Sequence, residues 1–491
     1  MGSKWDNSSD AAALARLATQ AMKDRGLEPE FPLEAIEQAE QTREPAQDDS
    51  KDIRDLRSLL WCSIDNDDSR DLDQLQVVES QDNGFLRVYV AVADVDALVK
   101  RGTPVDNHAV LNTTSVYTPA RIFPMLPEKF STNLTSLNPD VDRLAMVVAY
   151  SVDGRGGLSN EEVFRARVHN YAKLAYRSVG EWLIGEGSMP PAMAAVPGLD
   201  EQIRLQDEAA QRLRERRHDE GALELETIEL RTVITDGKVT DLKDDPKDRA
   251  HALIEDFMIA ANGVTTRYLV SRNFPTFRRV VMTPERWDKI EALAMSYGDR
   301  LPADPDSGAL NEFLIRRRKA DPLRFPDLSL MIIKLMGSGE YRAEPAGVKG
   351  EGHFGLAVRD YSHSTAPNRR YPDLITHRLL KAALAGEDSP YEDGELSGLA
   401  KHCTEQEDMA KKVERQVRKS AAALLLRDHI GQTFDGIITG ASQKGTWIRT
   451  LHPPIEGRIV EGYRGLDVGD RTHVRLIHVD VEKGFIDFAR D

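Results

Sequence analysis

The spacing of hydrophobic and polar positions changes several times along the chain. Residues 11–26 repeat alanine, leucine and methionine near the helical period and end at a glycine, and LEAIEQAEQ at 33–41 follows as a second short helix. Pro29 and Pro32 separate the two helices, and a polar linker occupies 43–52. The two helices are compatible with a helix-turn-helix or with an arm that packs on the next domain, and the packing arm is the favoured interpretation.

The middle of the chain mixes strands with long helices. LLWCSIDN at 59–66 and FLRVYVAVADV at 85–95 are rich in β-branched and aromatic residues, which favours strands. Residues 251–270 form an apolar pattern typical of a buried helix, and 401–426 form a longer helical pattern with charges on one side. This mixture predicts an α+β core.

The tail changes to short alternating strands separated by glycine-containing turns, which predicts a small closed β-barrel of the OB type. We therefore expect a short helical N-terminal element and linker at 1–55, a large mixed α+β domain at 56–427 and an OB-fold barrel at 428–491.

Composition narrows the classes of function. Lys and Arg number 65 against 81 Asp and Glu, a net charge of −16, so contact with nucleic acid requires a local basic groove. The two cysteines, Cys62 and Cys403, exclude a disulfide scaffold and a cysteine-based zinc site, and they favour a reducing cytoplasm. No apolar run is long enough for a membrane helix, and the first residues have no signal-peptide pattern.

The most informative segment is SIDNDDSRDLDQL at 63–75, which holds five aspartates within nine positions. Phosphodiester chemistry with Mg²⁺ needs several hard oxygen ligands that converge on a small volume. Asp71 and Asp73 are two residues apart and point to the same side of an extended backbone, while Asp65 leaves an apolar strand. The alternative is an acidic surface turn, which is what most aspartate-rich loops are.

The acidic segment and several longer stretches of the chain resemble the ribonuclease II / ribonuclease R family of 3′→5′ exoribonucleases, also called the RNB family. Ile64-Asp65…Asp71-Leu72-Asp73 fits its acidic motif, I-D-x5-D-x-D-D. TSVYTPARIFPMLPEKFSTNLTSLNPDVDRLAM at 114–146 and HALIEDFMIAAN at 251–262 continue the likeness. HFGLAVRDYSHSTAPNRRYPDLITHRLLKA at 353–382 is similar to the family's H-F-G-L…Y-x-H-x-T-S-P-I-R-R-Y-x-D-L. The anchors occur in family order between about residues 60 and 425.

The resemblance implies an RNB-type catalytic domain and an RNA-binding barrel. It implies processive 3′→5′ hydrolysis of single-stranded RNA to nucleoside 5′-monophosphates, at a two-metal Mg²⁺ site where Mn²⁺ substitutes. The expected partner is the 3′ end of single-stranded RNA. We expect no membrane partner, a monomer and a cytoplasmic location.

Site residues follow from the same resemblance, position by position. Those implied to act in catalysis are Asp71, Asp73 and Arg369, and those implied to hold metal are Asp65, Asp71, Asp73 and Gln74. A fixed guanidinium such as that of Arg369 suits the charge that builds on a scissile phosphate. The residues implied to contact RNA are Tyr117, Tyr176, Glu255, Arg370, Glu414, Trp447 and Arg449.

Physical arguments accompany these roles and leave alternatives open. Aromatic faces stack on any base at about 1–3 kcal/mol, although Tyr117 and Tyr176 would otherwise be read as core residues. Acids such as Glu255 and Glu414 suit sugar hydroxyls, or else are solvated helix charges. Arg370 either contacts RNA or pairs with Asp373. The basic stretches at 316–319 and 411–419 are candidates for a backbone funnel or are solvated helix faces. His353 and His363 lack metal-ligand spacing, so we expect them to be structural.

The chain departs from the family pattern in three places. Gln74 stands where the family has a fourth aspartate, which weakens at least one metal site. Residues 1–60 are too short and too helical for the two cold-shock domains usual at the front, so a variant without them is expected. Leu225 stands where an aromatic is common. Gln74 motivates an alternative, an RNA-binding relative with weakened or absent catalysis, and a nuclease that prefers DNA is a third hypothesis.

Overall fold

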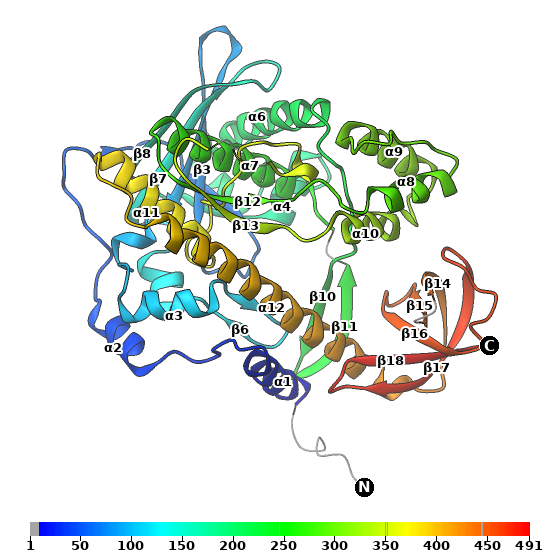
Figure 1. Cartoon of the computed structure of the whole chain (residues 1–491). Coiled ribbons are helices and arrows are strands. Elements are labelled where there is room, and N and C mark those ends of the chain that lie inside the picture. Colours follow the sequence, from blue (N-terminus) through cyan, green and yellow to red (C-terminus); the bar gives the residue numbers. More distant parts are fainter. Residues whose placement is uncertain (1–8, 245, 349, 351, 443–444) are drawn as a thin grey trace.

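A seven-stranded sheet, in the order β1-β8-β7-β4-β3-β2-β9, forms the centre of the computed structural model, which describes residues 9–491 except 245, 349, 351 and 443–444 (Figure 1). Its strands are β1 (Arg54–Asp55), β2 (Cys62–Asp65), β3 (Gln74–Ser80), β4 (Leu86–Ala93), β7 (Asp142–Val152), β8 (Leu158–His169) and β9 (Ala172–Ala175). The run from β8 to β2 is antiparallel, whereas β1 and β9 join its two edges in parallel.

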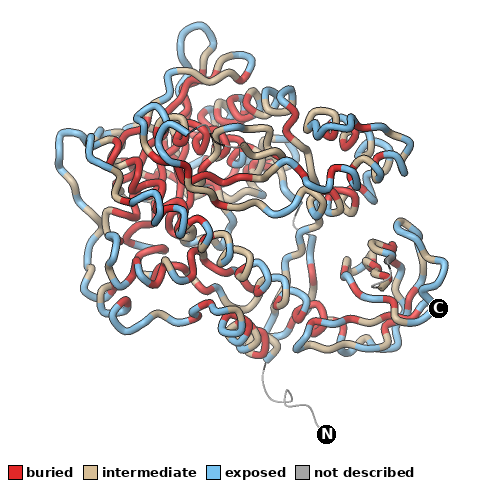
Figure 2. Tube along the Cα trace, viewed as in Figure 1, coloured by how far each residue is buried: buried red, intermediate tan, exposed pale blue. Residues whose placement is uncertain are grey.

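Helices cover this sheet because its central strands are apolar on both faces. Nearly every residue of β4 and β7 is buried, and Figure 2 shows the burial concentrated in these strands and the helices around them. Two long helices, α6 (Leu199–Asp219) and α7 (Arg249–Ser271), pack on one another and on the sheet. Asp248 and His251 form a capping box that starts α7, which agrees with the helix predicted at 251–270.

The elements that complete the central domain lie around α11 (Tyr371–Ala385) and α12 (Asp393–Leu426). The 34 residues of α12 span about 50 Å, and the helix runs from the central domain to the barrel (Figure 1). The smaller elements are η1 (Asp82–Gly84), η2 (Val95–Ala97), α3 (Pro104–Asn112), β5 (Val116–Tyr117), β6 (Ile122–Phe123), η3 (Phe130–Leu134), α4 (Tyr176–Leu183), α5 (Pro191–Ala194), β12 (Thr276–Val280), β13 (Glu340–Glu344), η4 (Phe354–Leu356) and η5 (Arg427–His429).

Two satellites project from this domain toward the barrel. One is a helical cluster with an apolar core of its own, made of α8 (Trp287–Ser296), α9 (Ser307–Ala320) and α10 (Phe325–Met336). The other is a two-stranded antiparallel ribbon, β10 (Leu230–Thr235) and β11 (Lys238–Asp244). The sequence patterns did not predict these satellites as separate units.

The N-terminal helices pack on different parts of the molecule. Helix α1 (Asp10–Asp24) is capped by the Ser9 side chain and shares an apolar cluster with α12, β11 and the β5–β6 hairpin. Helix α2 (Leu33–Gln41) packs against α3. This is the arrangement expected of a packing arm.

The C-terminal strands close into a five-stranded barrel, which confirms the predicted α+β class with a terminal β-barrel. The strands are β14 (Thr433–Ser442), β15 (Gly445–Thr450), β16 (Glu456–Glu461), β17 (Arg471–Asp480) and β18 (Phe485–Arg490). Its core continues into the end of α12 and into Leu242 of β11. Within the described ranges, no helix has the length and apolarity needed to cross a membrane.

Candidate active site

The acidic loop connects two strands of the central sheet. Asp65 is the last residue of β2, and β3 begins one residue after Asp73. The Ala93 amide at the end of β4 donates to the Asp73 carbonyl at 2.9 Å, and the Leu72 amide donates to the Ser136 hydroxyl at 2.9 Å. The loop is therefore fixed to the sheet at its second half, where Asp71 and Asp73 lie.

Asp73 is the most enclosed acid of this loop, with a side chain that is 2% exposed. The Asn368 amide donates to its Oδ1 at 2.9 Å, and Arg369 Nε donates to its Oδ2 at 3.0 Å. Burial raises the pKa of Asp73 to about 7; Asp71 adds to the rise, and Arg369 opposes it. One guanidinium thus compensates only part of the buried charge.

Asp71 and Asp65 border Asp73 on its more open side. Burial raises the pKa of Asp71 as well, with Arg369 opposing and Asp65 adding to the shift. The Asp65 Oδ1 accepts hydrogen bonds from the Asn66 amide at 2.7 Å and from another loop residue, Ser69, at 2.9 Å. The predicted trio therefore lies close enough to interact, with Arg369 among the three acids.

The metal ligands predicted from the sequence supply hard oxygen donors but no finished coordination shell. Among the described residues, no group of three or more His, Cys, Asp or Glu side chains is arranged to hold a metal ion. Both oxygens of Asp73 are engaged by Asn368 and Arg369. Gln74 is buried in β3, where its backbone pairs with Val92. Uncompensated carboxylates with raised pKa values fit the binding of a divalent cation.

The two arginines predicted for the site have different partners. Arg369 reaches Asp73, and 42% of its side chain remains exposed. Arg370 turns to Asp373, with Nη2 donating to Oδ1 at 2.8 Å. The same Oδ1 accepts from the Ala366 amide at 2.8 Å, so Asp373 holds the turn that presents both arginines. The structure thus contains the pair with Asp373 that the sequence analysis gave as one of two alternatives for Arg370.

Tyr117 joins the acid site to α12. Its hydroxyl donates to Asp71 Oδ2 at 3.2 Å, and its backbone amide donates to Glu414 Oε1 at 3.0 Å. Burial raises the pKa of Glu414. Tyr117 is 39% exposed. The structure thus places Tyr117 beside Asp71 and in contact with Glu414, and their contacts with RNA stay predictions.

Tyr176, the first residue of α4, packs against the start of α7, where Glu255 lies. Tyr176 directly follows Ala175, the residue paired with Asp65, and its ring stacks on His251 at 3.9 Å between centroids and 17° between planes. Glu255 lies one helical turn beyond His251 and approaches Lys247 at 3.7 Å. The stack with His251 was not predicted, because no local pattern links two rings so far apart in sequence.

A cavity of about 1430 Å³ leads from the start of α7 to the barrel. Its walls include Asp248 and Glu255 at one end and Phe434 and Arg449 at the other, and Leu225 lines it where the family often has an aromatic. The α7 end adjoins the Tyr176–His251 stack and hence Asp65. Its volume exceeds the range typical of small-molecule pockets.

The barrel residues predicted to bind RNA lie on β15. Trp447 is half-buried beside Gly440. Arg449 forms a two-pronged ion pair with Asp327 of α10, with Nη2–Oδ2 at 2.7 Å and Nε–Oδ1 at 3.2 Å. The guanidinium is therefore already engaged, and an RNA contact by Arg449 stays a prediction.

The remaining charged candidates are largely paired. In the stretch at 316–319, Arg316 pairs with Asp299 and Arg318 with Glu224. The row at 411–419 is exposed along α12, and its first lysine pairs with Glu407. The two histidines expected to be structural have internal partners, the Tyr341 hydroxyl for His363 and the Leu356 amide for His353.

The sequence argument missed Asn368. Its backbone amide is one of two groups that hold Asp73, and its side-chain oxygen accepts from Thr135. Asn368 stands directly before the arginine pair, where the family motif has isoleucine. Its place in the motif is the feature of the sequence that could have marked it as a site residue.

Comparison with known proteins agrees with this geometry. Residues 53–386 match the RNB domain, and residues 432–491 match the RNase II-type exonuclease C-terminal S1 domain. Ribonuclease R of Vibrio cholerae is 30% identical over 510 residues, covering 95% of this chain and 60% of the relative. The chain spans 53–64% of the length of the first curated relatives that it matches.

Solved structures share the fold. Mycoplasma genitalium RNase R in complex with ribose-methylated single-stranded RNA aligns with a TM-score of 0.87 at 22% identity, covering 97% of this chain and 78% of that chain. Yeast Ssd1, a pseudonuclease, aligns with a TM-score of 0.72 at 17% identity, covering 91% of this chain and 55% of that chain. Because the RNB domain matches well over half of the sequence, the chain belongs to the RNB-domain family and carries an RNase II-type S1 domain at its C-terminal end.

Proposed function

We propose that this chain is a metal-dependent exoribonuclease that removes nucleoside 5′-monophosphates from the 3′ end of single-stranded RNA. The observation that carries the proposal is the placement of Asp73, buried between the Asn368 amide and Arg369 and beside Asp71. A buried acid with a raised pKa, next to a partly exposed guanidinium, is the arrangement expected where a phosphate and a cation meet.

In this proposal the phosphate competes with Asp73 for Arg369. The guanidinium keeps 42% of its side chain exposed while it holds Asp73, so its free edge is open to a phosphoryl oxygen. Once Arg369 turns to the phosphate, Asp73 loses its main compensating charge and becomes a stronger ligand for a cation.

Mg²⁺ is the proposed cation, held by Asp65, Asp71 and Asp73, with Gln74 as an uncharged neighbour and Mn²⁺ as a substitute. The bound ion supplies Lewis-acid stabilisation of phosphoryl charge and lowers the pKa of a bound water. The three acids supply the hard oxygens that such an ion needs.

The 3′ end is held by residues around the acids. Tyr117 presents an accessible ring face next to Asp71, and Tyr176 borders Asp65. Stacking of this kind contributes about 1–3 kcal/mol per base and is tolerant of sequence. Glu255 and Glu414 are proposed to accept hydrogen bonds from the ribose hydroxyls of the last nucleotide. The cavity between α7 and the barrel is proposed to hold the upstream strand.

The test uses one RNA labelled at its 5′ end, which reports shortening, and one labelled uniformly, which reports released mononucleotides; each is incubated with the full chain in Mg²⁺, in Mn²⁺ and in EDTA. We expect stepwise shortening and release of 5′-mononucleotides in either metal, and none with the chelator. A matched DNA oligomer should resist, and its equal cleavage would assign the site to DNA instead. Failure of the parent to release mononucleotides, or release that EDTA leaves unchanged, would refute the proposal.

A second candidate function is RNA binding without cleavage. The reason to consider this function is Gln74, which stands where the acidic motif of the family has a fourth carboxylate. Asp73→Asn separates the two candidates. If the parent degrades RNA and the variant only binds it, the enzyme is supported; if both bind RNA equally and neither cleaves it, the binding function is supported.

A further inference from the structure

The cavity between α7 and the barrel is a half-open groove bordered by several elements. Its lining comes from the end of α6, the segment 223–229, β11, the start of α7, α9, α10, the end of α12 and the barrel. Figure 1 shows the barrel beside α10 on one side and at the end of α12 on the other. A polymer that occupies this groove therefore runs between the α7 end and the barrel, and the position of the barrel sets how far the groove is open on that side.

The junctions that attach the barrel to α12 and to α10 differ in kind. At α12 the barrel shares a continuous apolar core that includes Ala423, Leu426 and Phe488. At α10 the apolar clusters are separate, one belonging to the barrel and the other to α8–α10. Apolar burial thus fixes the barrel to α12, and the α10 junction depends on polar contacts.

The polar contact at α10 is the ion pair between Arg449 and Asp327. Both carboxylate oxygens are used, and the two side chains are only 12% and 15% exposed. A two-pronged pair of this burial is directional and is screened less by salt than a surface pair. Next to it, Gly469 comes so close to Arg324 that a Cβ there would lie 2.5 Å from the Arg324 Nη1. The junction is close-fitting but contributes no shared apolar core.

We propose that Arg449 and Asp327 form a latch that holds the barrel against α10 beside the RNA strand and sets how many nucleotides are removed per binding event. The proposal rests on the proposed function for the identity of the strand. The latch lies on the cavity wall at the barrel end, away from the acids at the α7 end, so it controls escape of the strand and leaves hydrolysis at the acids unchanged. Opening it needs only the ion pair to break, because the apolar hinge at α12 stays intact.

Asp327→Asn and Arg449→Met separate a latch from a direct RNA contact. If Arg449 binds RNA, Asp327→Asn frees the guanidinium and tightens binding, whereas Arg449→Met weakens it. If the pair is a latch, both variants act in the same direction. The exchange Asp327→Arg with Arg449→Asp restores the pair with reversed polarity and should recover the parental behaviour. Arg316→Met is the matched control, because it breaks a surface pair with Asp299 away from the cavity wall.

The measurement is the number of nucleotides removed per encounter, with labelled RNA pre-bound and excess unlabelled RNA added at the start. We expect both single variants to shorten the run by about threefold or more, the effect of losing a well-placed ion pair. Cleavage of a short oligomer that does not reach the barrel should be unchanged in the Asp327→Asn variant. Opposite effects of the two variants, no effect, or failure of the exchanged pair to rescue would overturn the latch.

A second measurement does not depend on hydrolysis. In the Asp73→Asn background, dissociation of a fluorescent single-stranded RNA should be about threefold faster with either latch variant and normal with the exchanged pair. If the parent does not cleave RNA but this pattern holds, the proposed function fails and the latch stands. If the parent cleaves RNA and dissociation is unaffected, the latch fails and the proposed function stands.

Discussion

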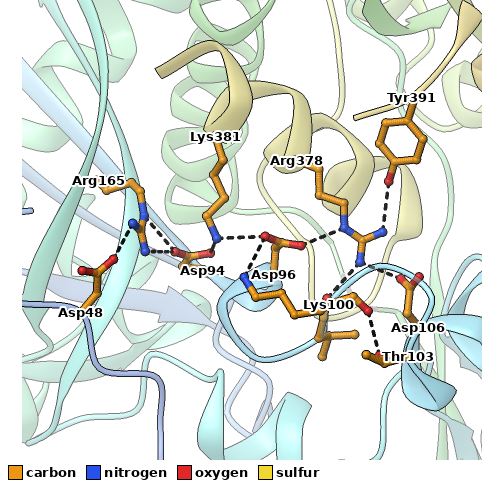
Figure 3. Close-up of polar contacts among 11 residues, drawn as sticks. Asp48, Asp94, Asp96, Lys100, Thr103, Asp106, Arg165, Arg378, Lys381 and Tyr391 are labelled. Atoms are coloured by element: carbon orange, nitrogen blue, oxygen red, sulfur yellow. Dashed lines mark hydrogen bonds and ion pairs between the residues drawn. The ribbon is translucent and has the colours of Figure 1, made fainter. Parts of the chain in front are cut away.

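Two clusters of buried carboxylates lie in the central domain, and they are balanced differently. In the first, Asp65, Asp71 and Asp73 share Arg369, and the pKa values of Asp71 and Asp73 are raised. In the second, Asp94 and Asp96 meet cations from several elements, drawn in Figure 3. The partners in that figure include Arg165, Lys100, Arg378 and Lys381.

The balanced cluster shows what full compensation does. Burial alone would raise the pKa of Asp94, but Lys381 and Arg165 outweigh it and lower the pKa. Asp96 behaves in the same way, with Lys381 and Arg378 as its cations. This network ties α11 to the sheet and to α3 and carries no excess charge. The acid site keeps an excess of negative charge that can bind a cation, whereas the network in Figure 3 has no such excess.

The change with the largest expected effect removes the uncompensated charge at the centre of the acid site. Asp73→Asn keeps the shape but takes away the carboxylate that Arg369 and the proposed metal share. We expect RNA hydrolysis to fall by about a thousandfold or more, the size of effect seen when an electrostatic group at a reacting phosphate or oxyanion is lost. Single-turnover rates on labelled RNA measure it, with RNA binding as the control that should be retained. Activity within tenfold of the parent would contradict the central role of Asp73.

Removing a cation from the balanced cluster should instead damage the fold. Arg378→Met leaves Asp96 and Asp106 without the guanidinium that now contacts both, at 2.9 Å and 2.7 Å. Breaking a buried pair from one side costs about 3–5 kcal/mol of unfolding free energy. Denaturant unfolding measures the loss, and Arg316→Met at the surface should cost under about 1 kcal/mol. Equal losses for the two variants would mean that the network is not a structural clamp.

Opposite pH dependences sharpen the contrast. Since the folded pKa of Asp73 is about 7 against an ordinary 3.8, the folded state binds more protons between those values. Its contribution therefore makes the unfolding free energy fall as pH rises from about 4 to 7, and Asp73→Asn should stabilise the metal-free chain at pH 8 by about 1–3 kcal/mol. Asp94, with a lowered pKa, stabilises above its unfolded pKa and loses that contribution as pH falls through its folded pKa.

The measurement is denaturant unfolding in EDTA at pH 5 and pH 8 for the parent and Asp73→Asn. The stabilisation should be larger at pH 8 than at pH 5, and added Mg²⁺ should reduce it by stabilising the parent. A variant that is less stable than the parent at pH 8 would show that Asp73 is fully compensated.

The two clusters also differ in how far the sequence predicted them. The acids, Arg369 and Tyr117 were named as candidates because the family motif places each within a short, readable segment. The Asn368 contact joins residues 295 apart, and the Arg378 contacts join residues more than 270 apart. Periodicity predicts the strands and helices that carry such residues, but their partners depend on tertiary packing, which local spacing does not encode. For the same reason, the sequence placed Arg449 on the barrel but did not reveal Asp327.

Adding charge to the unbalanced cluster is a milder change. Gln74→Asp restores the family's fourth acid at a buried position of β3. We expect the Mg²⁺ concentration for half-maximal activity to fall by about tenfold, the scale on which a coordinating or supporting group acts. The added carboxylate should destabilise the metal-free chain, because Arg369 would then have to compensate one more buried negative charge. Gln74→Glu is the matched control, since its longer side chain places the charge differently. An unchanged Mg²⁺ requirement would remove Gln74 from the metal site.

The smallest change tests whether Tyr117 acts by its ring or by its hydroxyl. Tyr117→Phe removes the hydrogen bond to Asp71 at 3.2 Å but keeps the exposed ring face that is proposed to stack on a base. At 3.2 Å this bond is long for a hydroxyl donor, so we expect its loss to cost about 1 kcal/mol and to change the rate by about three- to fivefold while RNA affinity is retained. Tyr117→Ala should lose affinity as well, by about tenfold, because the ring is removed. Since the hydroxyl donates to an acid that is short of compensating partners, its removal should also raise the pKa of Asp71 further and shift the rate profile toward higher pH. Equal affinities for the Phe and Ala variants would show that the ring does not stack on RNA and that Tyr117 serves only to hold Asp71.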